Sequence, residues 1–589
     1  MQLTGLDWWV LAGYGLMAVC AGLYFARRAG RSQGEFFLAG RKLPWWLLGT
    51  SMVATTFSTD TPNLVTDLVR NGGVSRNWEW WAFLITAMCT TFFYAKLWRR
   101  SEVFTDMGFY ELRYSGRPAS FLRGFRAVYL GLFFNVVIMA TVTLAAIKIA
   151  GILLGADRYT TVVVAGTATA LYAATSGLWG VVATDLILFA IAMVGSVGAA
   201  YYAVTHPAVG GLAAMTEHPA IADSLAMVPD PTNWSVFVPV LLVPIAVQWW
   251  STWYPGSEPG GGGYAAQRML AARTEQDAMK ATLWFNIAHY ALRPWPWILV
   301  ALASLAVYPT VDALAEAFPG LDPAILGDDL AYPAMLTHMP AGLRGLVVAS
   351  LAAAFMSTIS THLNWGSSYL VHDFYRRFAA KDRSERHYIM AARVSTVLLI
   401  VLSSVLALFL TGAEQAFHLI LALHAGSGLV FLLRWFWWRV NAWSEISAMA
   451  ASAATALWFA LFHEALGLGA LNSSVRLVMG VAITSAVWLG VTFLTPPTEK
   501  AKMQAFHDRV RPFSVGWRRA VDTSGVEPGG LAASMLAWAL GCATVYLALF
   551  AAGMALYGRT GPAITFGVLT AASGVWLFRV LPRASQTTA

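Results

Sequence analysis

Long runs of apolar residues, separated by short polar stretches, extend along the whole chain. A helix needs about 20 such residues to cross the roughly 30 Å hydrocarbon core of a bilayer. Backbone groups in lipid must bond within their own segment, so uniform runs indicate helices, and no run shows the alternation of barrel strands. The pattern predicts an all-α polytopic membrane protein with about 15 spans, near residues 7–26, 44–69, 77–99, 122–153, 160–178, 181–204, 236–254, 281–308, 341–372, 389–411, 415–438, 445–463, 475–495, 532–557 and 563–580.

The amino-acid composition agrees with this pattern. Of 589 residues, 58% are hydrophobic and 12% are charged, whereas soluble domains have about 25% charged residues. The mean hydropathy of +0.58 excludes a water-soluble globular protein. The three cysteines (Cys20, Cys89 and Cys542) show neither metal-ligand spacing nor a disulfide framework. Because no basic segment precedes the first apolar run, we expect that run to be a retained span and not a signal peptide.

The charge distribution predicts an orientation and argues against nucleic-acid binding. The net charge is +8, but the basic residues cluster in short loops between apolar runs, which is the positive-inside pattern. If each span crosses once, five basic loops fall on one side: 27–28, 99–126, 268–280, 376–393 and 500–519. We expect this side to be cytoplasmic, with the N-terminus outside and the C-terminus inside. Nothing in the sequence specifies an oligomeric state.

Two stretches contain residues that a plain lipid-facing helix avoids. Thr50–Pro62 (TSMVATTFSTDTP) places hydroxyls and Asp60 in the middle of a span, and Tyr254–Tyr264 (YPGSEPGGGGY) contains two prolines and five glycines. Pro removes a backbone donor and Gly costs backbone entropy, so both stretches are expected to interrupt helices. Paired interruptions at corresponding positions of two halves indicate the binding site of a transporter. The alternative is that the Gly-rich stretch is an ordinary cytoplasmic loop.

Four motifs resemble those of the sodium:solute symporter family, which includes bacterial sodium–galactose, sodium–proline and sodium–sialic acid transporters. They are Glu35–Ser58 (EFFLAGRKLPWWLLGTSMVATTFS), Ser176–Asp185 (SGLWGVVATD), Gln267–Arg273 (QRMLAAR) and Gly345–Tyr375 (GLVVASLAAAFMSTISTHLNWGSSYLVHDFY), and the resemblance covers roughly residues 5–440. It implies the inverted five-helix repeat of the leucine transporter type, in a bacterial inner (plasma) membrane.

This fold divides the chain into five parts. Residues 1–43 form an extra span with a cytoplasmic loop, and residues 439–589 form four additional spans with a basic loop near 496–531. The two five-helix repeats are 44–204 and 236–438, joined by an external loop at 205–235. The basic, amphipathic stretch 500–519 is expected to be a positive-inside loop or an element that lies on anionic lipid.

The resemblance also implies sodium as the coupling ion. The family's first sodium site matches the backbone carbonyls of Ala54 and Phe57, together with Ala354, Ser357 and Thr358. Na⁺ is a hard cation, and carbonyl and hydroxyl oxygens can replace its water shell. The alternative is that these small residues only allow close helix packing.

A second sodium site occurs in some members of the family. The matching positions are Asp185, Ser360 and Thr361, so we expect either one or two coupled sodium ions. The alternative for Asp185 is an ordinary helix N-cap at the cytoplasmic end of a span.

Buried ionisable and aromatic residues are the candidates for solute binding. By similarity to the sodium–galactose transporter, or by position, they are Asp60, Thr61, Glu79, Tyr254, Glu258, Tyr264, His289, Arg293 and His418. Departures from the galactose-binding pattern weaken galactose itself, but carboxylates, hydroxyls and tryptophans suit a sugar or polyol.

Other functions remain as alternatives. Arg293 would suit an amino acid or carboxylate, which it could bind bidentately, and proton coupling through Asp60 or Asp185 could replace sodium coupling. A substrate sensor without transport would fit the family, although no soluble signalling domain is recognisable. An intramembrane enzyme is disfavoured, because the sequence shows neither a metal-binding motif nor a nucleophile–base pair.

Overall fold

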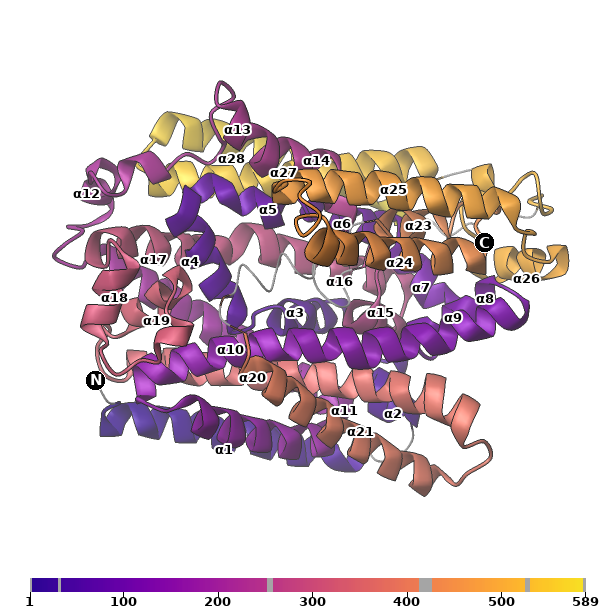
Figure 1. Cartoon of the computed structure of the whole chain (residues 1–589), viewed down its shortest axis with the longest axis horizontal. Helices are drawn as coiled ribbons and strands as arrows, with labels where there is room; N and C mark the ends of the chain where they lie inside the picture. The colour runs from indigo at the N-terminus through magenta and orange to yellow at the C-terminus, as the bar shows by residue number, and fades with distance from the viewer. Residues whose placement is uncertain are drawn as a thin grey trace.

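The computed structural model describes residues 3–29, 33–251, 258–410, 412, 426–524 and 530–585. Most of these residues are helical, and the long helices run side by side along the long axis of the molecule (Figure 1). Within them the only β-type pairing is one isolated parallel bridge between Leu43 and Ala272. The helical fold therefore agrees with the pattern of apolar runs.

The helices of the first half begin with α1 and end with α11. They are α1 (Gly5–Ala29), α2 (Gln33–Leu38), α3 (Trp45–Thr55), α4 (Asp60–Gly72), α5 (Trp78–Trp81), α6 (Leu84–Cys89), α7 (Ala95–Ser101), α8 (Phe109–Arg113), α9 (Gly116–Val128), α10 (Asn135–Leu154) and α11 (Arg158–Val204). The predicted spans 160–178 and 181–204 both fall within the range of α11.

The next group extends to α23. It comprises α12 (Leu212–Glu217), α13 (Trp234–Phe237), α14 (Val243–Ala246), α15 (Gly263–Ala271), α16 (Glu275–Ile287), α17 (Pro294–Val307), α18 (Val311–Ala317), α19 (Ala331–Leu336), α20 (Leu343–Ser368), α21 (Glu385–Ala407) and α23 (Gly428–Leu433). The last group is α24 (Ala442–Leu457), α25 (Ser473–Leu494), α26 (Lys500–Val510), α27 (Leu531–Leu556) and α28 (Thr560–Ser585).

Eight helical segments of the described residues are long and apolar enough to cross a membrane: Gly116–Leu154, Leu178–Val204, Glu275–Val307, Leu343–Ala379, Glu385–Ala407, Ser473–Leu494, Leu531–Leu556 and Thr560–Ala584. The runs predicted at 44–69, 77–99 and 236–254 are instead divided among shorter helices. Residues 415–425 of the run at 415–438 lie outside the described residues. The number of about 15 spans therefore stays a prediction.

Close packing of α10 against α20 depends on a glycine. A Cβ atom added to Gly366 would lie 2.1 Å from Asn135 Nδ2 and 2.9 Å from the Gly131 carbonyl oxygen. The Asn135 amide uses this space to donate to the His362 carbonyl oxygen at 2.7 Å, and its Oδ1 lies 2.7 Å from His362 Nδ1. Small residues allow this close approach of membrane helices.

We therefore expect Gly366→Ala to destabilise the protein by about 1–3 kcal/mol, because the methyl group overpacks the contact with Asn135. The measurement is the midpoint of thermal unfolding in detergent. Gly567→Ala on α28 is the matched control, since a Cβ there has no atom within 4 Å. Equal effects of the two substitutions would contradict this account of the α10–α20 contact.

The basic helix α26 packs its apolar face on the protein. Its residues Met503, Phe506, His507 and Val510 are buried, and the Phe506 ring stacks on Trp517 at 5.4 Å. The guanidinium of Arg100 also donates to the Val510 carbonyl oxygen at 2.9 Å. The protein therefore covers the apolar face of this helix, so that face is not available for insertion into lipid.

Candidate ion and solute site

The first interrupted helix breaks where the sequence predicts. α3 ends at Thr55, α4 begins at Asp60, and the residues between them are non-helical. At the break, the Phe57 N–H donates to the carbonyl oxygens of Val53 (2.9 Å) and Ala54 (3.0 Å). The whole segment from Thr50 to Thr59 is buried. Protein therefore surrounds the irregular backbone, which membrane depth requires.

The second interruption is also buried. After the short helix Gln248–Trp250, residues 252–257 lie outside the described part, and Glu258–Gly262 is non-helical and buried. The Trp98 indole N–H donates to the Gly260 carbonyl oxygen at 2.7 Å. Gly261 has φ of +89°, and a Cβ there would lie 2.6 Å from the Met269 methyl group, so the close packing requires glycine. The alternative of an ordinary solvated loop is wrong for these residues.

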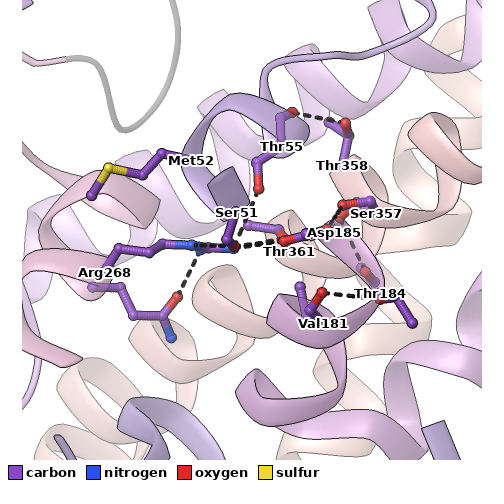
Figure 2. Close-up of polar contacts among 12 residues, drawn as sticks. Ser51, Met52, Thr55, Val181, Thr184, Asp185, Arg268, Ser357, Thr358 and Thr361 are labelled. Atoms are coloured by element: carbon purple, nitrogen blue, oxygen red, sulfur yellow. Dashed lines mark hydrogen bonds and ion pairs between the residues drawn. The ribbon is translucent and has the colours of Figure 1, made fainter. Parts of the chain in front are cut away.

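The first predicted sodium site lies where α3 meets α20. The Thr358 hydroxyl on α20 donates to the Thr55 carbonyl oxygen of the last turn of α3 at 2.9 Å (Figure 2). Ala54 lies beside Thr55, and Ala354 lies one turn before Thr358; both are buried. The carbonyl groups at the end of α3 and the buried Thr358 hydroxyl are hard oxygen donors, so these residues fit a sodium ion.

Ser357 has a different contact from the one the sequence implies. Its hydroxyl donates to Asp185 Oδ1 on α11 at 2.5 Å, and the Ser51 hydroxyl on α3 donates to Asp185 Oδ2 at 2.6 Å. Asp185 is fully buried within α11. The alternative of a helix N-cap is therefore wrong, and Asp185 connects α3, α11 and α20.

An arginine that the sequence reasoning assigned to a cytoplasmic loop lies in the same cluster. Arg268 on α15 is fully buried, and its Nη2 lies 4.0 Å from Asp185 Oδ2. The guanidinium donates to the hydroxyls of Ser51, Thr55 and Thr361, each at 3.3 Å (Figure 2). Two of the predicted ligands of the second sodium ion, Asp185 and Thr361, thus contact the guanidinium of Arg268. The Ser360 hydroxyl donates instead to the Ser357 carbonyl oxygen of its own helix at 3.1 Å.

Several predicted solute residues meet on the other side of the first break. His289 Nδ1 lies 3.1 Å from the Thr56 hydroxyl, and Arg293 Nη1 donates to the same hydroxyl at 3.1 Å. Arg293 Nη2 lies 3.2 Å from His289 Nε2, and the guanidinium lies 5.0 Å from the centre of the Trp297 ring. The broken end of α3 and the start of α17 therefore share one polar network.

Aromatic rings and the start of α4 complete this part of the site. The Trp80 ring stacks on Tyr290, with centroids 5.8 Å apart, and meets His289 edge-on at 5.8 Å. The Thr61 hydroxyl donates to the Thr56 carbonyl oxygen at 3.3 Å. Asp60 Oδ1 is buried without a hydrogen-bond partner in the described part of the chain.

The other predicted solute residues lie apart from this network. Glu79 forms an ion pair with Arg76 at 2.9 Å, and the Tyr264 ring lies 5.7 Å from the guanidinium of Arg268. Tyr254 and His418 fall outside the described residues.

Glu258, one of the predicted solute ligands, has a buried charged partner. It forms an ion pair with Arg126 on α9, in which the two side chains are 3% and 0% exposed. The Arg126 guanidinium also lies 4.6 Å from the centre of the Phe431 ring. The carboxylate therefore has a buried partner within the protein, which makes it less available to a solute.

Sequence reasoning missed the roles of Thr56 and Arg268. Thr56 belongs to the hydroxyl-rich stretch Thr50–Pro62, where any of several hydroxyls could have been chosen. Arg268 belongs to the family motif QRMLAAR, and the positive-inside pattern alone places it in a basic cytoplasmic loop.

The sequence of this chain is similar to that of known sodium-coupled transporters. Residues 36–452 match the family model described as the sodium:solute symporter family. A sodium/glucose cotransporter of Vibrio parahaemolyticus is 25% identical over 477 residues, which cover 78% of this chain and 85% of the relative. A sodium/mannose cotransporter, SLC5A10 of Bos taurus, is 26% identical over 550 residues, covering 86% and 89%.

A solved structure shares the fold. It is that of a Na⁺-coupled sialic acid symporter in a substrate-bound outward-open state, with a TM-score of 0.66 and 20% sequence identity. The match covers 84% of this chain and 99% of that structure. The predicted fold class is thereby confirmed.

Proposed function

Since the chain belongs to the sodium:solute symporter family, whose coupling ion is sodium, we propose that it imports a small polar organic solute, a sugar or polyol, by alternating access. The observation that carries the proposal is the family match over residues 36–452, because this range contains both buried helix breaks and α20. The relatives named as glucose and mannose cotransporters support the choice of a sugar.

The proposed sodium ligands are the carbonyl oxygens of Ala54, Phe57 and Ala354 and the hydroxyls of Ser357 and Thr358. The contact between Thr358 and Thr55 supports this assignment, because it brings α20 to the last turn of α3. An ion at this interface would hold the two helices together through their oxygen atoms. After its departure, the direct hydrogen bond and the contacts through Asp185 and Arg268 would still connect the two helices.

The proposed solute ligands lie on the opposite side of the break in α3. Asp60, Thr61 and His289 offer hydrogen-bonding groups, and the Trp80 ring offers an aromatic face, a combination that suits a polyhydroxylated solute. Glu79 and Tyr264 are further candidates that would join the site when helices move.

The alternative of a carboxylate solute gains less support. The Arg293 guanidinium already donates to Thr56 and to the Val53 carbonyl oxygen, and it lies beside His289. We assign Arg293 to holding the broken end of α3, where its Nη1 and Nη2 atoms contact groups of the protein.

The proposed transport sequence follows from these contacts. Sodium binds first and holds α3 against α20, the solute binds at the break, the site closes, and both are released on the other side. The two five-helix repeats, 44–204 and 236–438, would move relative to each other around the breaks. We also propose the orientation that the loop charges predict, with the N-terminus outside and the C-terminus in the bacterial cytoplasm.

Uptake into proteoliposomes tests the proposal. Radiolabelled D-glucose, D-mannose, N-acetylneuraminate and L-proline are supplied with an inward sodium gradient or an equal potassium gradient. We expect at least one of the two hexoses to accumulate only with sodium. Accumulation driven equally by potassium, or by a pH gradient without sodium, would reject sodium coupling; accumulation of N-acetylneuraminate or L-proline alone would reject the sugar assignment.

A further inference from the structure

The cluster around Asp185 contains a carboxylate and several hydroxyls that match a cation site, yet a protein cation lies among them. We propose that Arg268 is a tethered cation in the place predicted for a second sodium ion, so that the protein binds a single sodium ion. This inference rests on the proposed function, because it concerns the number of coupling ions.

Oxygen atoms that could bind a sodium ion in this cluster already contact Arg268. Three hydroxyl oxygens, those of Ser51, Thr55 and Thr361, accept from the guanidinium of Arg268 at 3.3 Å. The carboxylate of Asp185 lies 4.0 Å from the same Nη2 atom. A sodium ion that used these oxygens would have to displace the guanidinium from each of them.

Charge also opposes a second ion here. Asp185 and Arg268 are both fully buried, and together they carry no net charge. A sodium ion bound to Asp185 would place a second positive charge within a few ångströms of Arg268, away from water. Like charges repel strongly where the dielectric constant is low.

The position of Arg268 in the chain explains why its guanidinium stays beside Asp185 during the transport cycle. α15 follows directly after the buried Gly-rich interruption, and the side chain reaches α3 at Ser51 and Thr55 and α20 at Thr361. A sodium ion at the Thr358 site can leave when α3 and α20 separate. Arg268 remains bonded to the chain, so it neutralises Asp185 throughout the cycle without being transported.

Equilibrium binding of ²²Na⁺ to the purified full-length protein in lipid nanodiscs tests the proposal without any solute. The wild-type protein is expected to bind one sodium ion with a Hill coefficient of about 1. Arg268→Ala should expose the carboxylate and hydroxyls, so that the count rises to two and the Hill coefficient rises above 1. Arg268→Lys keeps a tethered charge and should return the count to one.

A double substitution identifies the second ion's site. Arg268→Ala combined with Asp185→Asn removes both charges and should bind one sodium ion, since the new site lacks its carboxylate. Two sodium ions on the wild-type protein would overturn the inference and leave the proposed function intact, and so would a folded Arg268→Ala variant that binds one. No sodium binding at all would overturn the proposed function itself.

Discussion

Removal of the Thr358 hydroxyl is expected to lower sodium affinity about 100-fold, because a hydrogen bond or ligand to a charged group contributes about 1.5–3 kcal/mol. Thr358→Val is the sharpest form of this change, since it keeps the shape of the side chain and removes only the oxygen. At a sodium concentration near the wild-type half-saturation value, sodium-driven uptake should fall almost to the background of empty liposomes. The measurements are the sodium dependence of initial uptake rates and direct ²²Na⁺ binding.

Thr358→Ser is the matched control, because it retains the hydroxyl that donates to the Thr55 carbonyl oxygen. It should stay within a few-fold of wild-type affinity. If the valine variant takes up solute with unchanged sodium dependence, Thr358 is not a sodium ligand, and its contact with Thr55 serves packing alone.

Arg126→Met is expected to destabilise the protein by about 3–5 kcal/mol, because it leaves the Glu258 carboxylate buried without its guanidinium partner. Both side chains are almost completely inaccessible to solvent, so water cannot compensate for the lost charge. A large decrease in thermal unfolding temperature, measured in detergent by intrinsic fluorescence, is the expected readout. The 26 tryptophans give a strong signal.

A double substitution separates the ion pair from general packing. Arg126→Met with Glu258→Gln replaces two charges by neutral side chains of similar size, and it should recover most of the lost stability. If the double variant is less stable than Arg126→Met alone, so that the two losses of stability add, the broken ion pair is not the cause of the destabilisation.

The breaks in the helices were predictable because their chemistry is local. Pro62 and the hydroxyl-rich stretch before it oppose a continuous helix whatever surrounds them, and the glycines of 260–263 do the same. The structure adds that both stretches are buried, which depends on distant partners such as Trp98. Local sequence thus indicates where a helix stops, and tertiary packing decides whether the interruption is exposed to solvent.

The candidate site was predictable only in part, for the same reason. Thr358 and Ala354 lie on one face of α20, so their spacing and motif already place them together. Glu258 and Arg126 are 132 positions apart in the chain, and no local pattern connects them. Arg268 resembles a basic loop residue until α15 turns its side chain inward toward Asp185.

The arginine beside Asp185 also has a consequence for the conditions in which a cell can use this transporter. One sodium ion moving through 100 mV releases about 2.3 kcal/mol, enough for about 50-fold accumulation of an uncharged solute, whereas two ions would allow about 2,500-fold. With only that potential as driving force, a cell that keeps about 1 mM of the solute inside therefore needs about 20 μM outside. One coupled sodium ion, as proposed above, would favour growth where the nutrient is moderately abundant and sodium entry has to be kept low, and not scavenging from very dilute surroundings.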